Sequence, residues 1–188
     1  NAGAFGGEIK DSVISVSSID MDQSEKQIVR NNEGCGFDYR TSIFKGTASD
    51  EIITEGKLKL SPGVREEIKN KCEENMQYRK DRQPIDFPSA GSTFKNVDVR
   101  KITDDQKSEW ASVIKTDPFP VVPAAFLISE AGLKGHRTGG AMISEKHPNF
   151  FINTGGATSD DVRKLISETK EMIKNKFGIE MEEEVQIV

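Results

Sequence analysis

The chain has 188 residues, which is enough for one large domain or two small ones. It carries 26 basic and 31 acidic residues, and the resulting net charge of −5 argues against a general nucleic-acid binder, which needs a basic surface. Hydrophobic residues make up 35% and charged residues 30%, as is typical of a globular protein with a modest core. No apolar run approaches the length of a membrane span.

The first third of the chain is predicted to be rich in β-structure. Strand patterns occur at 13–19 and at 51–60, and turn-forming residues at 31–36 separate them.

A long helix is expected next. Ser61 is predicted as its N-cap, Pro62 as its first helical residue, and Arg82 as its approximate end, because Pro84 follows. One apolar stripe would run along it, formed by Val64, Ile68, Cys72 and Met76.

Helices and strands alternate in the remainder. Thr103 to Gln106 is a capping-box sequence, 124–131 favours a short helix, and a last helix is predicted from about Asp160 to Phe177, with Ser159 as its cap and Gly178 after its end. Its predicted core-facing residues are Val162, Leu165, Ile166, Met172, Ile173 and Phe177.

Strand candidates lie at 142–143, 150–152 and 184–188. Interspersed strands and helices favour an α/β or α+β fold, with a domain boundary near 61–65.

The two cysteines, Cys35 and Cys72, lack metal-ligand spacing. We expect reduced thiols of a cytoplasmic protein, although the sequence leaves a disulfide between them open. Two histidines without an acidic pair at ligand spacing argue against a metal site. The chain has no initiator Met and no targeting segment, and we interpret it as the C-terminal part of a longer polypeptide.

The segment from Pro88 to Asn96 has the strongest chemical pattern. Gly91 permits a tight turn, Ser92 supplies a hydroxyl, and Lys95 and Asn96 add a charge and an amide. This cluster suits a site that holds an anionic ligand and transfers a proton. Taken alone, these residues favour an ordinary turn loop with a solvated lysine.

Further motifs follow one another in a fixed order. They are 1–9 (NAGAFGGEI), 39–45 (YRTSIFK), 82–84 (RQP), 131–135 (AGLKG), 139–141 (GGA), 144–150 (SEKHPNF) and 178–185 (GIEMEEEV). Together with the Ser92 segment, this set resembles the UDP-N-acetylenolpyruvoylglucosamine reductase (MurB) family from residue 1 to residue 188.

The resemblance implies a domain organisation and an activity. Residues 1–64 would end an FAD-binding domain, and residues 65–188 would form a C-terminal α/β substrate-binding domain. The enzyme would reduce UDP-N-acetylglucosamine enolpyruvate to UDP-N-acetylmuramate with FAD and NADPH, in peptidoglycan precursor synthesis. It would be a cytoplasmic monomer that binds a UDP-sugar and neither nucleic acid nor a membrane.

The resemblance also implies three catalytic residues. Ser92 would be the proton donor, Arg40 would bind the enolpyruvyl carboxylate, and Glu184 matches the C-terminal glutamate of the family. An arginine fork fits a carboxylate bidentately, although without the resemblance Arg40 could equally be a surface arginine. Glu182 and Glu183 are interpreted as members of a solvated acidic face.

The remaining candidates would bind substrate or flavin. Asn96 matches an amide near the substrate diphosphate, Arg82 or Lys80 would supply a cation there, and His147 would be a polar substrate neighbour or a structural histidine. The glycines expected to approach the flavin are Gly3, Gly6 and Gly7, and Phe5 stands where the family often has Tyr.

Two alternatives remain open. The chain could be a non-catalytic nucleotide-sugar binder, or a flavin oxidoreductase of another substrate class, because fold does not fix function. The 188 residues alone are expected to lack turnover, because the resemblance places part of the flavin site before residue 1.

Overall fold

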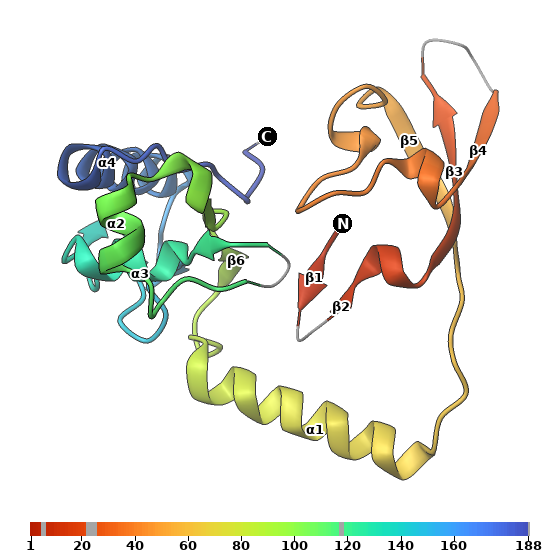
Figure 1. The fold of residues 1–188 in the computed structure, drawn as a ribbon, viewed down its shortest axis with the longest axis horizontal. Coiled ribbons are helices and arrows are strands. Elements are labelled where there is room, and N and C mark those ends of the chain that lie inside the picture. Colours follow the sequence, from red (N-terminus) through yellow and green to blue (C-terminus); the bar gives the residue numbers. More distant parts are fainter. Residues whose placement is uncertain (5–6, 22–25, 117–118, 188) are drawn as a thin grey trace. The chain divides into compact units, whose positions relative to one another are not determined.

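A computed structural model describes residues 1–4, 7–21, 26–116 and 119–187. The chain divides into two compact units, Asn1–Asn75 and Met76–Val188, and each is described by itself (Figure 1). Phe5, Gly6 and Val188 lie outside the described residues. Small sheets alternate with helices along the described chain, so the prediction of a mixed α/β fold is confirmed.

The first unit contains a strand pair and a three-stranded sheet. β1 (Gly3–Ala4) pairs with β2 (Gly7–Glu8). The sheet is antiparallel throughout, in the order β4–β3–β5. Its strands are β3 (Val13–Asp20), β4 (Gln27–Asn31) and β5 (Glu51–Leu58), and the 3-10 helices of the unit are η1 (Ile9–Asp11), η2 (Glu33–Cys35) and η3 (Ile43–Lys45). The predicted strands at 13–19 and 51–60 are therefore confirmed.

A charged network joins the three strands of this sheet. The Arg30 guanidinium donates to both oxygens of Glu51 at 2.6 Å, and the Ser18 hydroxyl donates to Glu51 at 2.5 Å. The arginine lowers the pKa of Glu51, and Ser18 adds to this effect. Because bidentate charged pairs have a fixed geometry, the network specifies how β3, β4 and β5 align.

Both cysteines are free thiols, as expected. Cys35 is buried, and this burial raises the pKa of its thiol, whereas Cys72 is exposed.

Helix α1 (Arg65–Arg82) starts later than the sequence predicted. Ser61 and Pro62 precede it in irregular backbone, so their assignment as N-cap and first helical residue is wrong. The predicted apolar stripe is also exposed: Val64, Ile68 and Met76 are 52–60% accessible. The division between the units falls inside α1, and the domain boundary at residues 64 and 65 stays a prediction.

The second unit is built around an antiparallel sheet in the order β6–β11–β10–β9. Helix α4 packs against β9, β10 and helix α3 (Figure 1). The strands are β6 (Ser89–Ser92), β9 (Arg137–Thr138), β10 (Ala141–Ile143) and β11 (Phe150–Asn153), with a separate pair β7 (Val97–Asp98) and β8 (Val121–Val122). The helices are η4 (Val99–Lys101), α2 (Asp104–Glu109), α3 (Ala124–Glu130) and α4 (Ser159–Phe177).

Side-chain caps fix where two of these helices begin. The predicted capping box of α2 is confirmed, because Thr103 and Gln106 exchange side-chain and backbone hydrogen bonds at 3.0 and 3.2 Å. The N-cap of α4 is Thr158, which forms the same box with Asp161, and the prediction of Ser159 is wrong by one residue. Gly178 ends α4 with a φ of 71°, as predicted.

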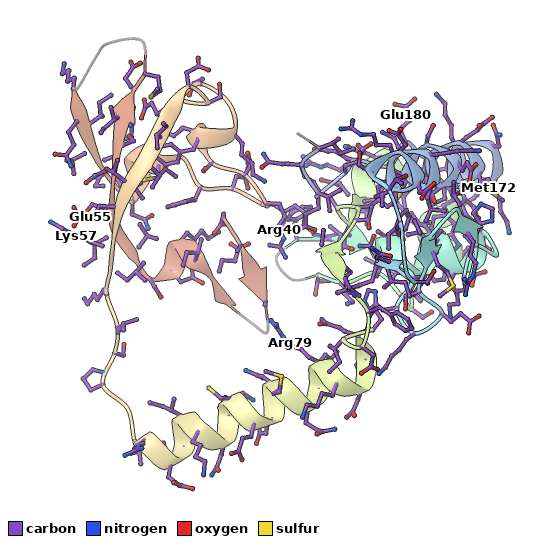
Figure 2. All side chains as sticks on the ribbon, turned by 180° about the vertical axis from the view of Figure 1, so that it is seen from behind. Arg40, Glu55, Lys57, Arg79, Met172 and Glu180 are labelled. Atoms are coloured by element: carbon purple, nitrogen blue, oxygen red, sulfur yellow. The ribbon has the colours of Figure 1, made fainter. Side chains whose placement is uncertain are left out.

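The core of the second unit is contributed by its helices and strands together. Leu165 and Ile173 of α4 are completely buried and Ile166 is 3% exposed, which confirms most of the predicted apolar face. Met172 is 42% exposed on the outer side of α4 (Figure 2), so its prediction as a core residue is wrong. Trp110 packs edge-on against the rings of Phe126 and Phe177, at centroid distances of 5.6 and 5.5 Å.

Residues 184–187 do not form the strand that the sequence predicted at 184–188, and Val188 lies outside the described residues. The pairing of the C-terminal segment is limited to an isolated antiparallel bridge between Phe94 and Glu183, flanked by backbone hydrogen bonds. The Lys95 N–H donates to the Glu182 carbonyl at 2.9 Å, and the Glu184 N–H donates to the Thr93 carbonyl at 2.8 Å.

Candidate active site

Ser92 lies at the end of strand β6, where it pairs with Phe150 of β11. Gly91 before it has a φ of +88°, a conformation that glycine adopts without the penalty of a Cβ. The sequence predicted a tight turn at this glycine, but Gly91 lies within strand β6, where the pairing with β11 shifts register, so the turn prediction is wrong although the conformation does favour glycine. Ser92 is half-buried beside it.

The structure brings Glu184 to the Ser92 loop. Thr93 follows Ser92, is 3% exposed, and accepts hydrogen bonds through its carbonyl from the N–H groups of Glu184 and Val185 at 2.8 and 3.4 Å. The two predicted catalytic residues are thus joined through the backbone of one buried residue, although more than ninety positions separate them in the sequence.

Asn149 is a residue of this site that the sequence reasoning missed. Its side chain is buried, and its amide contacts the backbone of Phe94. The available signal was an amide residue between Pro148 and the apolar run that begins at Phe150, because a buried polar side chain next to a strand needs specific partners.

Lys95 and Asn96 already have partners within the second unit. The Lys95 ammonium forms an ion pair with Glu182 and lowers the pKa of that carboxyl. The Asn96 side-chain oxygen accepts from the Ala124 N–H at 3.1 Å, at the start of α3. The role of Asn96 in binding the substrate stays a prediction.

Two acidic residues of the tail are paired with lysines. Glu183 lies 2.8 Å from the ammonium of Lys170, and Glu182 contacts Lys95. Glu182 is exposed and Glu183 is half-buried, and each also forms an ion pair with a lysine of another segment.

His147 has an unusual environment for a surface loop. Its ring packs edge-on against Phe150 at a centroid distance of 4.8 Å, and its Nδ1 atom is buried without a hydrogen-bond partner in the described part of the chain. Burial lowers the pKa of His147, and the charge of Lys115 adds a smaller effect in the same direction. The ring is therefore neutral near pH 7 and can accept or donate a hydrogen bond through Nδ1. By contrast, His136 is hydrogen-bonded to Glu168 at 3.0 Å.

Arg82 ends α1 and is exposed. Its guanidinium lies 4.7 Å from the centroid of the Tyr78 ring, in a cation–π contact. The Lys80 carbonyl accepts a hydrogen bond from Lys146. These contacts do not select between Lys80 and Arg82 as the substrate cation, and Arg82 stays a prediction.

In the first unit, Arg40 has a φ of +54°, which is uncommon for a residue with a Cβ. Its Nη2 donates to the Gly3 carbonyl at 3.1 Å, and its Nη1 lies 3.6 Å from a carboxylate oxygen of Glu8. The Tyr39 ring centroid lies 5.0 Å from the guanidinium carbon. Strained backbone of this kind costs about 1–3 kcal/mol and persists where surrounding contacts determine it, often at functional sites.

The glycines predicted to approach the flavin differ in their surroundings. A Cβ added at Gly3 would lie 2.7 Å from Nη1 of Arg40, whereas a Cβ at Gly7 would meet none of the described residues within 4 Å. Gly7 is exposed, so its backbone leaves room for a flat group such as a flavin ring. Gly6 lies outside the described residues.

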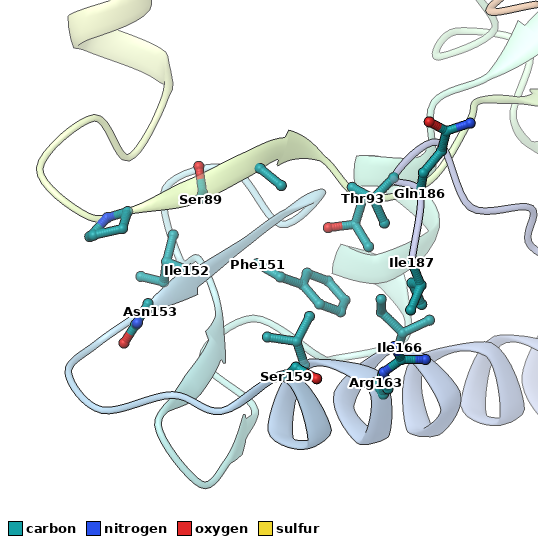
Figure 3. A pocket seen from close by; sticks show the side chains of 14 residues that line it. Ser89, Thr93, Phe151, Ile152, Asn153, Ser159, Arg163, Ile166, Gln186 and Ile187 are labelled. Carbon is teal, nitrogen blue, oxygen red and sulfur yellow. The ribbon is translucent and has the colours of Figure 1, made fainter. Parts of the chain in front are cut away.

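A cavity of about 540 Å³ lies beside the Ser92 loop in the second unit. Figure 3 shows Phe151 on one wall, Ile166 and Arg163 of α4 on another, and Thr93 at the edge. Ser92 and Glu184 do not line it, but the neighbouring residues Thr93 and Val185 do. The cavity therefore borders the residues that directly follow the two candidate catalytic residues.

Among residues 1–4, 7–21, 26–116 and 119–187, no group of three or more His, Cys, Asp or Glu side chains could hold a metal ion. No helix in the same residues is long and apolar enough to cross a membrane.

Comparison of this sequence with known protein families identifies the class of protein to which it belongs. Residues 83–188 match the model of the C-terminal domain of UDP-N-acetylenolpyruvoylglucosamine reductase. A protein of that name from Bacillus licheniformis is 37% identical over 188 residues, and the chain covers 89% of its length. The chain belongs to the UDP-N-acetylenolpyruvoylglucosamine reductase family, as its motifs suggested.

Longer relatives and a solved structure agree with this assignment. The reductases of Caldanaerobacter subterraneus subsp. tengcongensis and Lachnoclostridium phytofermentans are both 40% identical over the whole chain, which spans 54% and 52% of their lengths. The chain thus spans about half the length of these relatives. The crystal structure of MurB from Thermus caldophilus has a TM-score of 0.69 and 30% identity, and the match covers 99% of this chain and 56% of that one.

Proposed function

We propose that this chain carries the substrate-binding and proton-donating residues of an enzyme that reduces UDP-N-acetylglucosamine enolpyruvate to UDP-N-acetylmuramate. The observation that carries the proposal is the backbone link between Ser92 and Glu184 through Thr93. This link occurs in a chain that is 40% identical, over all 188 of its residues, to a protein named UDP-N-acetylenolpyruvoylglucosamine reductase. The reaction would supply a precursor of peptidoglycan.

The proposed reaction adds a hydride to one carbon of the enolpyruvyl double bond and a proton to its neighbour. Bound FAD, itself reduced by NADPH, would supply the hydride. Ser92 would donate the proton. Because a serine hydroxyl is a weak acid, it can act only when the receiving carbon becomes strongly basic and the geometry is closely held. Arg40 would bind the substrate carboxylate through two parallel hydrogen bonds.

The remaining predicted residues divide between substrate and cofactor. Asn96, Arg82 and His147 would contact the nucleotide-sugar, and Glu184 would act beside Ser92. The open space at Gly7 supports a flavin contact there, and Gly3 and Gly6 would flank it. We infer a cytoplasmic protein that is a monomer; sedimentation of the full-length protein would test the oligomeric state, and fractionation of cells would test the location.

Two separately measured half-reactions test the proposal. In the full-length enzyme, Ser92→Ala should leave reduction of the flavin by NADPH within about twofold of wild type, because that step needs no substrate proton. Its reoxidation by the UDP-sugar should slow by ~10²–10⁴-fold, the typical contribution of general acid catalysis. Stopped-flow absorbance of the flavin measures both steps.

Ser89→Ala provides the matched control, because Ser89 lies at the opposite end of the same strand and is exposed. It should leave both half-reactions near wild type. A Ser92→Ala enzyme with an unimpaired oxidative half-reaction would overturn the assignment of the proton donor. A wild-type enzyme that is reduced by NADPH but not reoxidised by this UDP-sugar would indicate a flavin oxidoreductase of another substrate class.

A further inference from the structure

The side chain of Asn149 is bonded to both polar groups of one backbone residue. Its Oδ1 accepts from the Phe94 N–H at 3.0 Å, and its Nδ2 donates to the Phe94 carbonyl at 2.8 Å. Asn149 is 4% exposed and Phe94 is 1% exposed, so water does not compete for these bonds. The amide thus pairs with Phe94 as a neighbouring strand would, through one donor and one acceptor.

The main chain of Asn149 adds a third bond to the same loop. Its carbonyl accepts from the Thr93 N–H at 2.8 Å. One buried residue therefore fixes the backbone of the two positions that directly follow Ser92. The Phe94 ring reinforces this placement, because it packs edge-on against Phe151 at a centroid distance of 5.8 Å.

Thr93 transmits this placement to the C-terminal segment. Its N–H is held by Asn149, and its carbonyl is held by the N–H of Glu184 at 2.8 Å. The peptide groups on the two sides of Thr93 are thus bonded in series between Asn149 and Glu184. A shift of the Thr93 backbone would move Ser92 and Glu184 relative to each other.

We infer that Asn149 is a positioning residue that sets the Ser92 hydroxyl against Glu184. This inference rests on the proposed function, because it assigns Asn149 to the proton-donating step of that reaction. Asn149 itself contacts backbone atoms and acts through Ser92. Its effect should therefore appear in proton delivery to the substrate, and flavin reduction by NADPH should not depend on it.

A buried asparagine could also serve stability alone, and the two roles differ in what they change. Loss of stability lowers the amount of folded, active enzyme. It therefore reduces the amplitudes of both half-reactions in the same proportion and leaves their rate constants unchanged. Loss of position lowers the rate constant of the oxidative half-reaction at saturating UDP-sugar. It also disappears once Ser92 is removed, because no hydroxyl is left to misplace.

The experiment uses the full-length holoenzyme with Asn149→Ala, Asn149→Asp and the control Thr169→Val. Asn149→Asp preserves volume and an oxygen toward the Phe94 N–H but loses the donor to the Phe94 carbonyl, so it remains informative if Asn149→Ala fails to fold. Thr169 is completely buried and donates to the Leu165 carbonyl at 2.7 Å within α4. Thr169→Val therefore removes one buried side-chain hydrogen bond away from the Ser92 loop.

We expect both Asn149 variants to keep the wild-type rate constant for flavin reduction within about twofold. At saturating UDP-sugar their oxidative rate constant should fall by ~10–100-fold, as a misplacement of about 1 Å can cause. In a Ser92→Ala background, Asn149→Ala should cause no further loss. Thr169→Val should leave both rate constants unchanged per folded molecule.

Three results would overturn the inference. One is an oxidative rate constant in both Asn149 variants equal to that of Thr169→Val. Another is a loss that adds fully to that of Ser92→Ala, which would mean that Asn149 does not act through the serine. If wild-type enzyme itself does not transfer hydride to the UDP-sugar, both the proposed function and the role of Asn149 are wrong, whereas the first two results leave the proposed function intact.

Discussion

Gly3→Ala is expected to disturb Arg40 without disturbing the backbone. A Cβ at this position would lie 2.7 Å from Nη1 of Arg40, and ordinary contact begins at 3.4 Å, so the guanidinium would have to retreat by about 0.7 Å. The hydrogen bond from Nη2 to the Gly3 carbonyl starts at 3.1 Å and the contact with Glu8 at 3.6 Å, so a shift of this size breaks or weakens both. Misplacement on this scale predicts a loss of about 10–100-fold in kcat/KM for the UDP-sugar.

Steady-state kinetics of the full-length enzyme, combined with stopped-flow flavin reduction, measure this effect. Gly56→Ala is the control, because a Cβ at Gly56 on β5 would meet none of the described residues within 4 Å. If Gly3→Ala retains the wild-type kcat/KM for the UDP-sugar, the guanidinium does not need its observed contacts, and the carboxylate-binding role of Arg40 in this geometry is wrong. If instead FAD is lost from Gly3→Ala, the glycine acts mainly on the flavin, as the family resemblance implied.

Three other predictions concern binding, packing and pH. Arg40→Lys should raise KM for the UDP-sugar more than a conservative exchange suggests, because lysine retains the charge but lacks the two-pronged donor; steady-state kinetics equal to wild type would contradict this. Leu165→Ala should lower the free energy of unfolding by ~2–5 kcal/mol and Met172→Ala by less than about 1 kcal/mol, because only Leu165 is completely buried; urea unfolding followed by the fluorescence of Trp110 compares them. Burial lowers the pKa of His147 below its ordinary value of 6.5, so the unfolded chain binds the proton more readily; the stability from neutral His147 is complete above about pH 6.5 and is lost as the pH falls toward the folded pKa. His147→Gln should therefore unfold with a weaker pH dependence between about pH 7.5 and 5, and an unchanged slope would be evidence against the burial argument.

Local signals in the sequence predicted the helix ends of the second unit well. The capping box at Thr103 and the glycine at 178 each act through a few adjacent residues, so a short pattern contains the information. The prediction of Ser159 missed by one residue because Thr158 and Ser159 have the same capping chemistry, and only the partner Asp161 selects between them.

Signals that depend on distant residues were less informative. The spacing of Val64, Ile68 and Met76 predicts a buried stripe, yet these residues are exposed within the two described units. The alternation near Val185 predicts a strand, but the segment pairs with 93–95 only through an isolated bridge and a few backbone bonds. Periodicity indicates which side chains could share a face, and it does not indicate whether another segment covers that face.

The candidate site shows the same division. The Ser92 loop was visible in the sequence because glycine, serine and asparagine leave a compositional trace. The link to Glu184 and the contacts behind the proposed role of Asn149 were not visible, because they depend on backbone atoms that every residue has. Asn149 lies in the motif at 144–150, but nothing in its neighbours indicates that its amide reaches Phe94, 55 positions earlier in the chain.

Proton donation by Ser92, as proposed above, would require that the backbone of this segment be held closely. A catalytic histidine or glutamate can be adjusted by shifting its pKa, whereas a serine hydroxyl remains a weak acid at any ordinary pH and must depend on orientation. In the second unit, three hydrogen bonds from Asn149 and one from Glu184 meet at Thr93 and Phe94, which are 3% and 1% exposed. Orientation is thus set by buried neutral bonds, which salt and moderate changes of pH do not weaken. Salt screens exposed ion pairs such as Lys174–Glu180, but it does not weaken buried hydrogen bonds between neutral groups. The oxidative half-reaction should accordingly depend on Asn149 to the same extent at low and at high ionic strength.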